Sequence, residues 1–181
     1  ILQPDALFVA IDGERFCGTD FARDAKQAGA VAVMASSAPD RETPSIVVKD
    51  TELALWKLAE LWRSRVSLPM IGVTGSNGKT TVKEMIASIL GKMGRTHASP
   101  GNFNNHLGVP LTLLGIRPEH EFAVVEMGMS HPGEIGQLTR LVRPSIALIT
   151  NAAHAHLEGL GSLSDVVRAK AEIFLGLQSG G

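Results

Sequence analysis

The sequence predicts an α/β fold in which a small first unit is followed by a second unit with a mainly parallel sheet. Short apolar runs alternate with helical stretches along the 181 residues, a pattern typical of parallel strands covered by helices. In addition, a glycine-bearing loop at residues 75–81 stands directly between an apolar run and a helix. That setting is the one a phosphate-binding loop requires.

The first unit is predicted to run strand, helix, strand, strand, helix. Each strand is a short apolar run, and each helix has apolar residues at helical spacing. Thr19 and Asp20 can cap the first helix and Gly29 can end it. The second helix begins at Asp50 or Thr51, and residues 63–69 are expected to break it. The expected strands are residues 7–11, 30–35 and 45–48.

The second unit is predicted to begin after Pro69. It opens with a strand at residues 70–74, and a helix from Thr80 to about Met93 follows the loop. The remaining expected elements are strands at residues 122–126 and 146–150 and helices at residues 133–141 and 165–177. We therefore place a domain boundary near residues 66–69, which gives domains 1–68 and 69–181.

Composition argues against several classes of protein. The formal net charge is −1, which gives no general attraction to nucleic acid or to anionic lipid. A single cysteine, Cys17, fits a reducing compartment. We expect a soluble, cytoplasmic protein, because no apolar run is long enough to span a bilayer and the start does not resemble a signal peptide. We also expect a monomer, although the sequence leaves the oligomeric state open. Both ends read as cut, so we expect a piece of a longer polypeptide.

The loop carries the residues that phosphate binding needs. Gly75 and Gly78 let the backbone turn so that N–H groups face one anion. Lys79 supplies an ammonium for the β- and γ-phosphates, and the Thr80 hydroxyl is placed to ligate Mg²⁺. The motif is the shorter G-x-x-G-K-T form, and the alternative is a glycine turn with a chance lysine and threonine. The predicted nucleotide-binding residues are Gly75, Ser76, Asn77, Gly78, Lys79, Thr80 and Thr81.

The loop and several further blocks resemble the Mur ligases, which add amino acids to UDP-muramoyl peptides. The resemblance is strongest to the member that adds D-alanyl-D-alanine to UDP-N-acetylmuramoyl-tripeptide. At the front of the chain, residues 7–10, 13–16 and 20–21 resemble the substrate domain of that member. The other blocks that carry the resemblance are residues 74–85, 101–110, 126–135, 155–162 and 169–174.

The resemblance implies a UDP-muramoyl-peptide-binding domain at residues 1–68 and the first part of a central ATPase domain at residues 69–181. It implies an ATP- and Mg²⁺-dependent ligase of peptidoglycan synthesis, and hence of cell shape and division, that works through an acyl phosphate. Its implied partners are UDP-N-acetylmuramoyl-tripeptide and D-alanyl-D-alanine, with no nucleic acid and no membrane insertion. Alone, this piece is expected to be inactive, since the rest of the ATPase domain and the closing C-terminal domain are absent.

Three residues beyond the loop are candidate catalytic and metal-site residues. Glu126 ends a strand expected beside the loop strand, where its carboxylate suits Mg²⁺; the alternative is a solvated or paired glutamate. The resemblance makes His156 a magnesium-associated histidine. It also makes Lys170 a carbamylated lysine, which turns a cation into an anion near the metal. The alternative for Lys170 is an ordinary solvated lysine.

The predicted substrate-binding residues are Asn102, Asn104, Asn105 and Arg15. By analogy with the family, the asparagine loop touches the γ-phosphate or the substrate, and the alternative is turn chemistry, for which asparagine is favoured. Other functions remain open at this point: another Mur ligase, a folylpolyglutamate synthase, or a nucleotide-binding module without ligase activity. The sequence leaves open whether the third acceptor residue is diaminopimelate or lysine.

Overall fold

The computed structural model describes residues 5–153 and 162–180, and it confirms the α/β fold. The chain divides into two compact units, Ile1–Leu58 and Ala59–Gly181. The division falls within helix α2 (Thr51–Arg65). The predicted boundary near residues 66–69 follows the end of that helix and stays a prediction. Each unit has its own parallel sheet.

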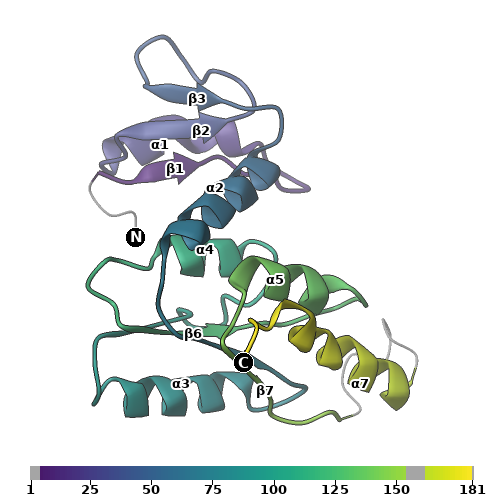
Figure 1. Ribbon diagram of the computed structural model, residues 1–181. Helices are drawn as coiled ribbons and strands as arrows, with labels where there is room; N and C mark the ends of the chain where they lie inside the picture. Colours follow the sequence, from purple (N-terminus) through teal and green to yellow (C-terminus); the bar gives the residue numbers. More distant parts are fainter. Residues whose placement is uncertain (1–4, 154–161, 181) are drawn as a thin grey trace. The chain divides into compact units, whose positions relative to one another are not determined.

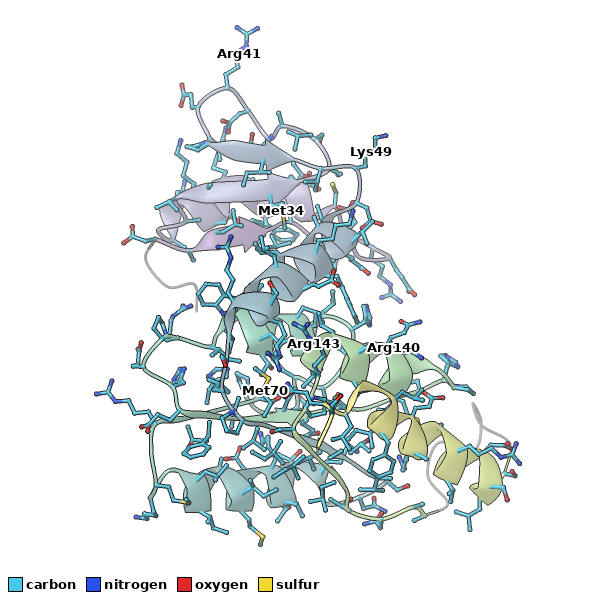
Figure 2. The ribbon with its side chains drawn as sticks, in the orientation of Figure 1. Met34, Arg41, Lys49, Met70, Arg140 and Arg143 are labelled. Atoms are coloured by element: carbon cyan, nitrogen blue, oxygen red, sulfur yellow. The ribbon has the colours of Figure 1, made fainter. Side chains whose placement is uncertain are left out.

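The first unit contains a three-stranded parallel sheet in the order β1-β2-β3 (Figure 1). Small buried side chains, Ala10, Ala22, Val33 and Ala35, form a core against which Phe8 packs. Figure 2 shows the side chains of Arg41 and Lys49 pointing outward from this unit. Its elements before α2 are β1 (Leu7–Val9), η1 (Gly18–Phe21), α1 (Ala22–Gln27), β2 (Ala32–Ala35) and β3 (Ser45–Val47).

The second unit contains a four-stranded sheet in the order β5-β6-β4-β7, and all of its pairings are parallel. The strand before the loop, β4, is central, so the loop emerges between two neighbouring strand ends. The elements are β4 (Met70–Thr74), α3 (Lys79–Leu90), β5 (Thr96–Ala98), α4 (Gly108–Leu114), β6 (Phe122–Glu126), α5 (Glu134–Val142), β7 (Ile146–Ile149), α7 (Leu163–Ala171) and η2 (Glu172–Gly176).

Helices cover both faces of this sheet. Helix α3 lies along one face, while α4 and α5 lie on the other (Figure 1). On the α3 side, the strand residues Ile71, Val73 and Val124 form an apolar cluster with residues of α3, namely Val82, Ile86, Ala87 and Leu90. Alternation along β4 turns Met70 and Gly72 toward the opposite face. The helix is thereby fixed against the strand that precedes the loop.

Two elements of the second unit were not predicted from the sequence. Strand β5 reads Thr-His-Ala and has no apolar run to reveal it. Helix α4 is short and begins at Gly108, with Pro110 in its first turn, where a proline is tolerated because the N–H it lacks has no helical partner. Sequence reasoning treats a glycine and a proline so close together as a loop.

The predicted break at residues 63–69 was wrong at its start, because α2 continues to Arg65. Arg63 is only 4% exposed. Its guanidinium donates from Nε to the carbonyl of Val142 at 2.6 Å, and from its other nitrogens to the carbonyls of Val66 at 2.8 Å and Arg143 at 2.9 Å. Burial, and secondarily the charge of Arg143, lowers the pKa of Arg63 to about 10. The end of α2 is thus fastened to the end of α5.

Replacing Arg63 with Met should destabilise the second unit of the full-length protein by roughly 2–4 kcal/mol, because buried carbonyls lose a charged donor. The measurement is chemical denaturation followed by the fluorescence of Trp62, whose indole N–H donates to the carbonyl of Ile116 in the same unit. Arg140→Met is the matched control, since Arg140 on α5 is exposed (Figure 2). Equal stability of the two variants would contradict this role of Arg63.

Candidate functional site

The loop between β4 and α3 has the backbone that its two glycines allow. Gly75 has φ of 150°, and a Cβ there would lie 1.9 Å from Oγ1 of Thr150. Gly78 has φ of 75° and immediately precedes α3, which begins at Lys79. Because the first N–H groups of a helix have no partner within it and carry the positive end of the helix dipole, this end of α3 favours an anion.

The loop is also fastened to the end of the neighbouring strand β7. The N–H of Ser76 donates to the carbonyl of Asn151 at 3.0 Å. The N–H of Asn77 donates to Oδ1 of Asn151 at 3.1 Å, and the Asn77 carbonyl accepts from Asn151 Nδ2 at 3.0 Å and from Thr150 Oγ1 at 2.7 Å. These N–H groups are engaged by the protein, so we expect a phosphate to meet the N–H groups from Gly78 onward.

Lys79 lies over the loop. Its Nζ donates to the carbonyl of Gly75 at 2.9 Å and lies 3.5 Å from that of Ser76. A lysine side chain is long and mobile, so the ammonium can exchange these carbonyls for phosphate oxygens. The contacts hold a positive charge at the mouth of the loop.

Glu126 lies at the carboxyl end of β6, beside the loop strand as predicted, where Val73 of β4 pairs with it. It is 1% exposed. Its Oε2 accepts from Thr80 Oγ1 at 2.8 Å, and its Oε1 accepts from Asn104 Nδ2 at 2.7 Å. Both of these donors are neutral. A nearly buried carboxylate held by neutral donors gains further stabilisation from a cation.

The donor set at Glu126 fits Mg²⁺. Thr80 and Glu126 together offer hydroxyl and carboxylate oxygens, which this ion prefers, and it commonly takes its remaining ligands from phosphates and water. Within residues 5–153 and 162–180, no group of three or more His, Cys, Asp or Glu side chains is placed to hold a metal.

Lys170 is a buried lysine of the second unit. It lies on α7 and is 2% exposed. The pKa of Lys170 is lowered to about 8, chiefly because burial disfavours the charged ammonium and also because Lys79 is close by. The structure thus brings Lys170 to the same end of the sheet as Lys79. The repulsion between two ammonium groups is reduced when one of the lysines is neutral or when an anion lies between them.

The position of Lys170 is fixed by the residues that follow it. The carboxylate of Glu172 accepts from the N–H groups of Gly133 at 2.8 Å and Gly136 at 2.9 Å, at the start of α5. Thr139 Oγ1 donates to the carbonyl of Ile173 at 2.7 Å. The 3-10 helix η2, which directly follows α7, is thereby anchored on α5, on the face of the sheet opposite α3 (Figure 1).

Of the remaining predicted site residues, some lie at the site and others do not. Asn104 contacts Glu126, as described, whereas Oδ1 of Asn105 accepts from the N–H groups of Leu107 and Gly108, which is the turn role weighed as its alternative. Asn102 is exposed. Arg15 is exposed and belongs to the first unit. His156 lies outside the described residues. The substrate and metal roles of these residues stay predictions.

Two participants were missed by sequence reasoning. Lys83 of α3 is fully buried, and Ser99, 1% exposed, accepts the N–H of Glu126 on its Oγ at 3.0 Å. A signal for Lys83 exists in the sequence, since it stands at helical spacing from Ile86, Ala87 and Leu90, on the apolar stripe that packs against the sheet. No comparable pattern marks Ser99.

Comparison with known proteins confirms the resemblance. Residues 73–181 match the model of the Mur ligase middle domain, and residues 2–62 match that of the Mur ligase family catalytic domain. The chain is 50% identical to the UDP-N-acetylmuramoyl-tripeptide–D-alanyl-D-alanine ligase of Escherichia coli, and 45% identical to that of Bacillus subtilis. Each alignment covers 99% of this chain and 40% of the relative, so the chain spans about two fifths of their length.

Solved structures agree with this assignment. A crystal structure of MurF from Acinetobacter baumannii superposes with a TM-score of 0.90 at 39% identity, covering 99% of this chain and 40% of that one. The MurF ligase of Thermotoga maritima in complex with ADP gives a TM-score of 0.84 at 34% identity, covering 98% of this chain and 42% of that one.

Replacing Lys79 with Ala in the full-length protein should lower ATP-dependent turnover by about 10²–10³-fold, because the ammonium stabilises charge on the transferred phosphoryl group. The measurement is steady-state release of phosphate from ATP. Lys92→Ala, at an exposed lysine just beyond α3, is the control and should match the parent. A Lys79→Ala protein within about tenfold of the parent would contradict the assignment of the loop.

Proposed function

This chain belongs to the Mur ligase family, and we propose that the full-length protein joins D-alanyl-D-alanine to UDP-N-acetylmuramoyl-tripeptide at the expense of ATP. The observation that carries the proposal is the cluster at one end of the second sheet: an anion-binding loop, the Thr80–Glu126 pair and a buried Lys170 beside Lys79. The relatives that carry this activity in their names match nearly the whole chain.

The domain assignment is part of the proposal. Residues 1–68 form the UDP-muramoyl-peptide-binding domain, and residues 69–181 form the first part of the ATPase domain. The two matched family segments, residues 2–62 and 73–181, support a boundary between them. The Thermotoga maritima relative was solved with ADP, which supports a nucleotide at the loop between β4 and α3. The chain spans about two fifths of its relatives' length, and we expect these residues by themselves to bind ATP weakly and to turn over nothing.

The chemistry follows from bringing two anions together. The carboxylate of the tripeptide attacks the γ-phosphorus of ATP, the bond to the β–γ bridging oxygen breaks, and ADP leaves. Lys79 and the N–H groups at the start of α3 stabilise the charge on the transferred phosphoryl group. The dipeptide amine then attacks the acyl carbon of the acyl phosphate, loses a proton and displaces phosphate, which leaves an amide.

Thr80 and Glu126 would hold a magnesium ion, which would supply charge neutralisation for the bound triphosphate. Glu126 suits this role because its carboxylate is 1% exposed and accepts from the Thr80 hydroxyl, so that both oxygen ligands lie together. Asn104 orients the other carboxylate oxygen. His156, which the family resemblance associates with magnesium, belongs to the proposed set.

Lys170 acts as a carbamate in this proposal. A neutral amine takes up CO₂ and releases a proton, which leaves an anion in place of a cation. Burial and the lowered pKa of about 8 keep much more of Lys170 neutral near physiological pH than an ordinary lysine. The charge of Lys79 acts on Lys170, so a carbamate there would replace a repulsion between two cations with an attraction.

The cellular setting follows from the substrates. The product is a peptidoglycan precursor, so the protein serves cell-wall synthesis, cell shape and division, and we place it in the cytoplasm as a monomer. In the part of the chain that the structure describes, no helix has the length and apolar character that crossing a membrane demands.

The direct test incubates the full-length protein with UDP-N-acetylmuramoyl-tripeptide, D-alanyl-D-alanine, ATP and Mg²⁺, and measures phosphate release together with the ligated product. We expect stoichiometric product and phosphate, and neither without the dipeptide. Activity only with a different amino acid or with a folyl acceptor would replace this proposal by another ligase of the same chemistry. ATP binding without turnover on any acceptor would make the protein a nucleotide-binding module.

Replacing Lys170 with Ala should lower ligation by about 10²-fold or more, because the anionic group beside the metal is lost. Addition of short carboxylic acids, which can occupy the vacated position, should restore part of the activity. Arg168→Ala is the control, since the Arg168 side chain is 78% exposed on the same helix. An unimpaired Lys170→Ala enzyme would make Lys170 an ordinary helical lysine.

A further inference from the structure

Lys83 has no place in the reaction described above, yet it is among the most completely buried side chains of the second unit. It lies on α3 with 0% exposure. Its Nζ donates to the carbonyls of Ser99 at 2.7 Å and Gly101 at 2.9 Å, and it lies 2.8 Å from Oε1 of Glu84. An ammonium has three N–H donors, and each finds an acceptor here. Burying an unpaired charge is costly. The two carbonyls, of Ser99 and Gly101, are therefore held close to the ammonium of Lys83.

The segment that Lys83 holds is the one that fixes Glu126. The carbonyl of Ser99 accepts from Lys83, and the Oγ of Ser99 accepts from the N–H of Glu126 at 3.0 Å. Further along the same segment, Asn104 donates from Nδ2 to the Glu126 carboxylate at 2.7 Å, and its carbonyl accepts the N–H of Gly128, also at 2.7 Å. Backbone and side chain of Glu126 are therefore both held by residues 99–104.

Helix α3 reaches Glu126 by two routes. Thr80, in its first turn, donates to the carboxylate directly. Lys83 follows three residues later, on the same face of the helix, and acts through segment 99–104. Helix α3 also lies along β6, the strand that Glu126 ends (Figure 1). Helix α3 therefore holds both the phosphate loop, which it directly follows, and the carboxylate of Glu126.

We propose that Lys83 is a positioning residue of the nucleotide site: it fixes segment 99–104 to α3, so that Asn104 and Glu126 keep their places relative to Thr80 and the phosphate loop. The inference rests on the proposed function of this site and adds a residue that touches neither nucleotide nor metal. A lysine that only stabilised the fold would not act specifically through Asn104 and Glu126.

The first test needs no ligase activity. In the full-length protein, Lys83→Met keeps the bulk of the side chain and removes its donors. The amide protons of Glu126 and Gly128, which donate to Ser99 and Asn104, should then exchange with solvent about tenfold faster, as expected when an anchoring charged hydrogen bond is lost. Lys92→Met is the control, because Lys92 is exposed, and it should match the parent. Unchanged exchange in folded Lys83→Met overturns the proposal.

The second test asks whether Lys83 acts through Asn104. Lys83→Met and Asn104→Ala should each lower kcat by about ten- to hundredfold, as small misplacements of catalytic groups do. The double variant should be no slower than the slower single variant, because both changes release the same carboxylate. Multiplying effects would mean independent roles and would overturn the proposal. An inactive parent would instead contradict the proposed function and leave the exchange test standing.

If Lys83→Met does not fold, Lys83→Gln is read by the same two criteria. The glutamine retains a neutral donor, which is too short to reach both carbonyls, so faster exchange at Glu126 and Gly128 is again expected. If neither variant folds, Lys83 is a residue of the fold alone and the positioning role is wrong.

Discussion

A carboxylate almost wholly removed from water, that of Glu126, determines the arrangement of the second unit around the site. One of its oxygens accepts from Thr80 at the start of α3, and the other accepts from Asn104 on the opposite side. A buried carboxylate without partners would cost several kcal/mol, so the helix and the asparagine segment are held to it. In the part of the chain that the structure describes, the side-chain donors to this carboxylate are the neutral groups of Thr80 and Asn104, beside an anion-binding loop. That combination is what a magnesium–nucleotide complex requires.

The other half of the site contains two lysines, Lys79 and Lys170. Burial disfavours the ammonium of Lys170, and the charge of Lys79 adds to this effect, so the pKa of Lys170 is lowered to about 8. In the proposed function, a triphosphate at the loop would offset the charge of Lys79, and a carbamate would replace the charge of Lys170. Hydrogen bonds from Asn151 and Thr150 join the loop to the end of β7. The long side chain of Lys79 is the part of the loop best able to move when a ligand binds.

Sequence reasoning recovered the parts of this site that are local in the chain. The strand–loop–helix at residues 70–90 was predicted because Gly75 and Gly78 mark the turn and apolar residues mark its flanks. Glu126 was placed beside the loop because parallel strands end at a common edge. Segments such as β5 and α4 were missed, since a three-residue strand and a helix opening with glycine and proline give no periodic signal.

Buried charges were the least predictable feature. Arg63 was taken for part of a helix break and Lys83 passed unnoticed, because a charged residue is normally solvated. What buries them is a set of carbonyls supplied from elsewhere: Ser99 lies sixteen residues after Lys83, and Val142 lies seventy-nine after Arg63. Only the folded chain brings those carbonyls together. For Lys170 it was the family resemblance that led to the residue, and the structure adds the burial.

The central claim is that the Glu126 carboxylate serves the metal of the nucleotide complex. The measurement is the Mg²⁺ dependence of ligation by full-length Glu126→Gln, which keeps the shape of the side chain and an oxygen for Asn104 while losing the charge. We expect the Mg²⁺ concentration for half-maximal rate to rise by about tenfold or more, as when a ligand or its support is removed, with kcat lowered by about 10²-fold. A Mg²⁺ dependence and a kcat equal to those of the parent would contradict the account.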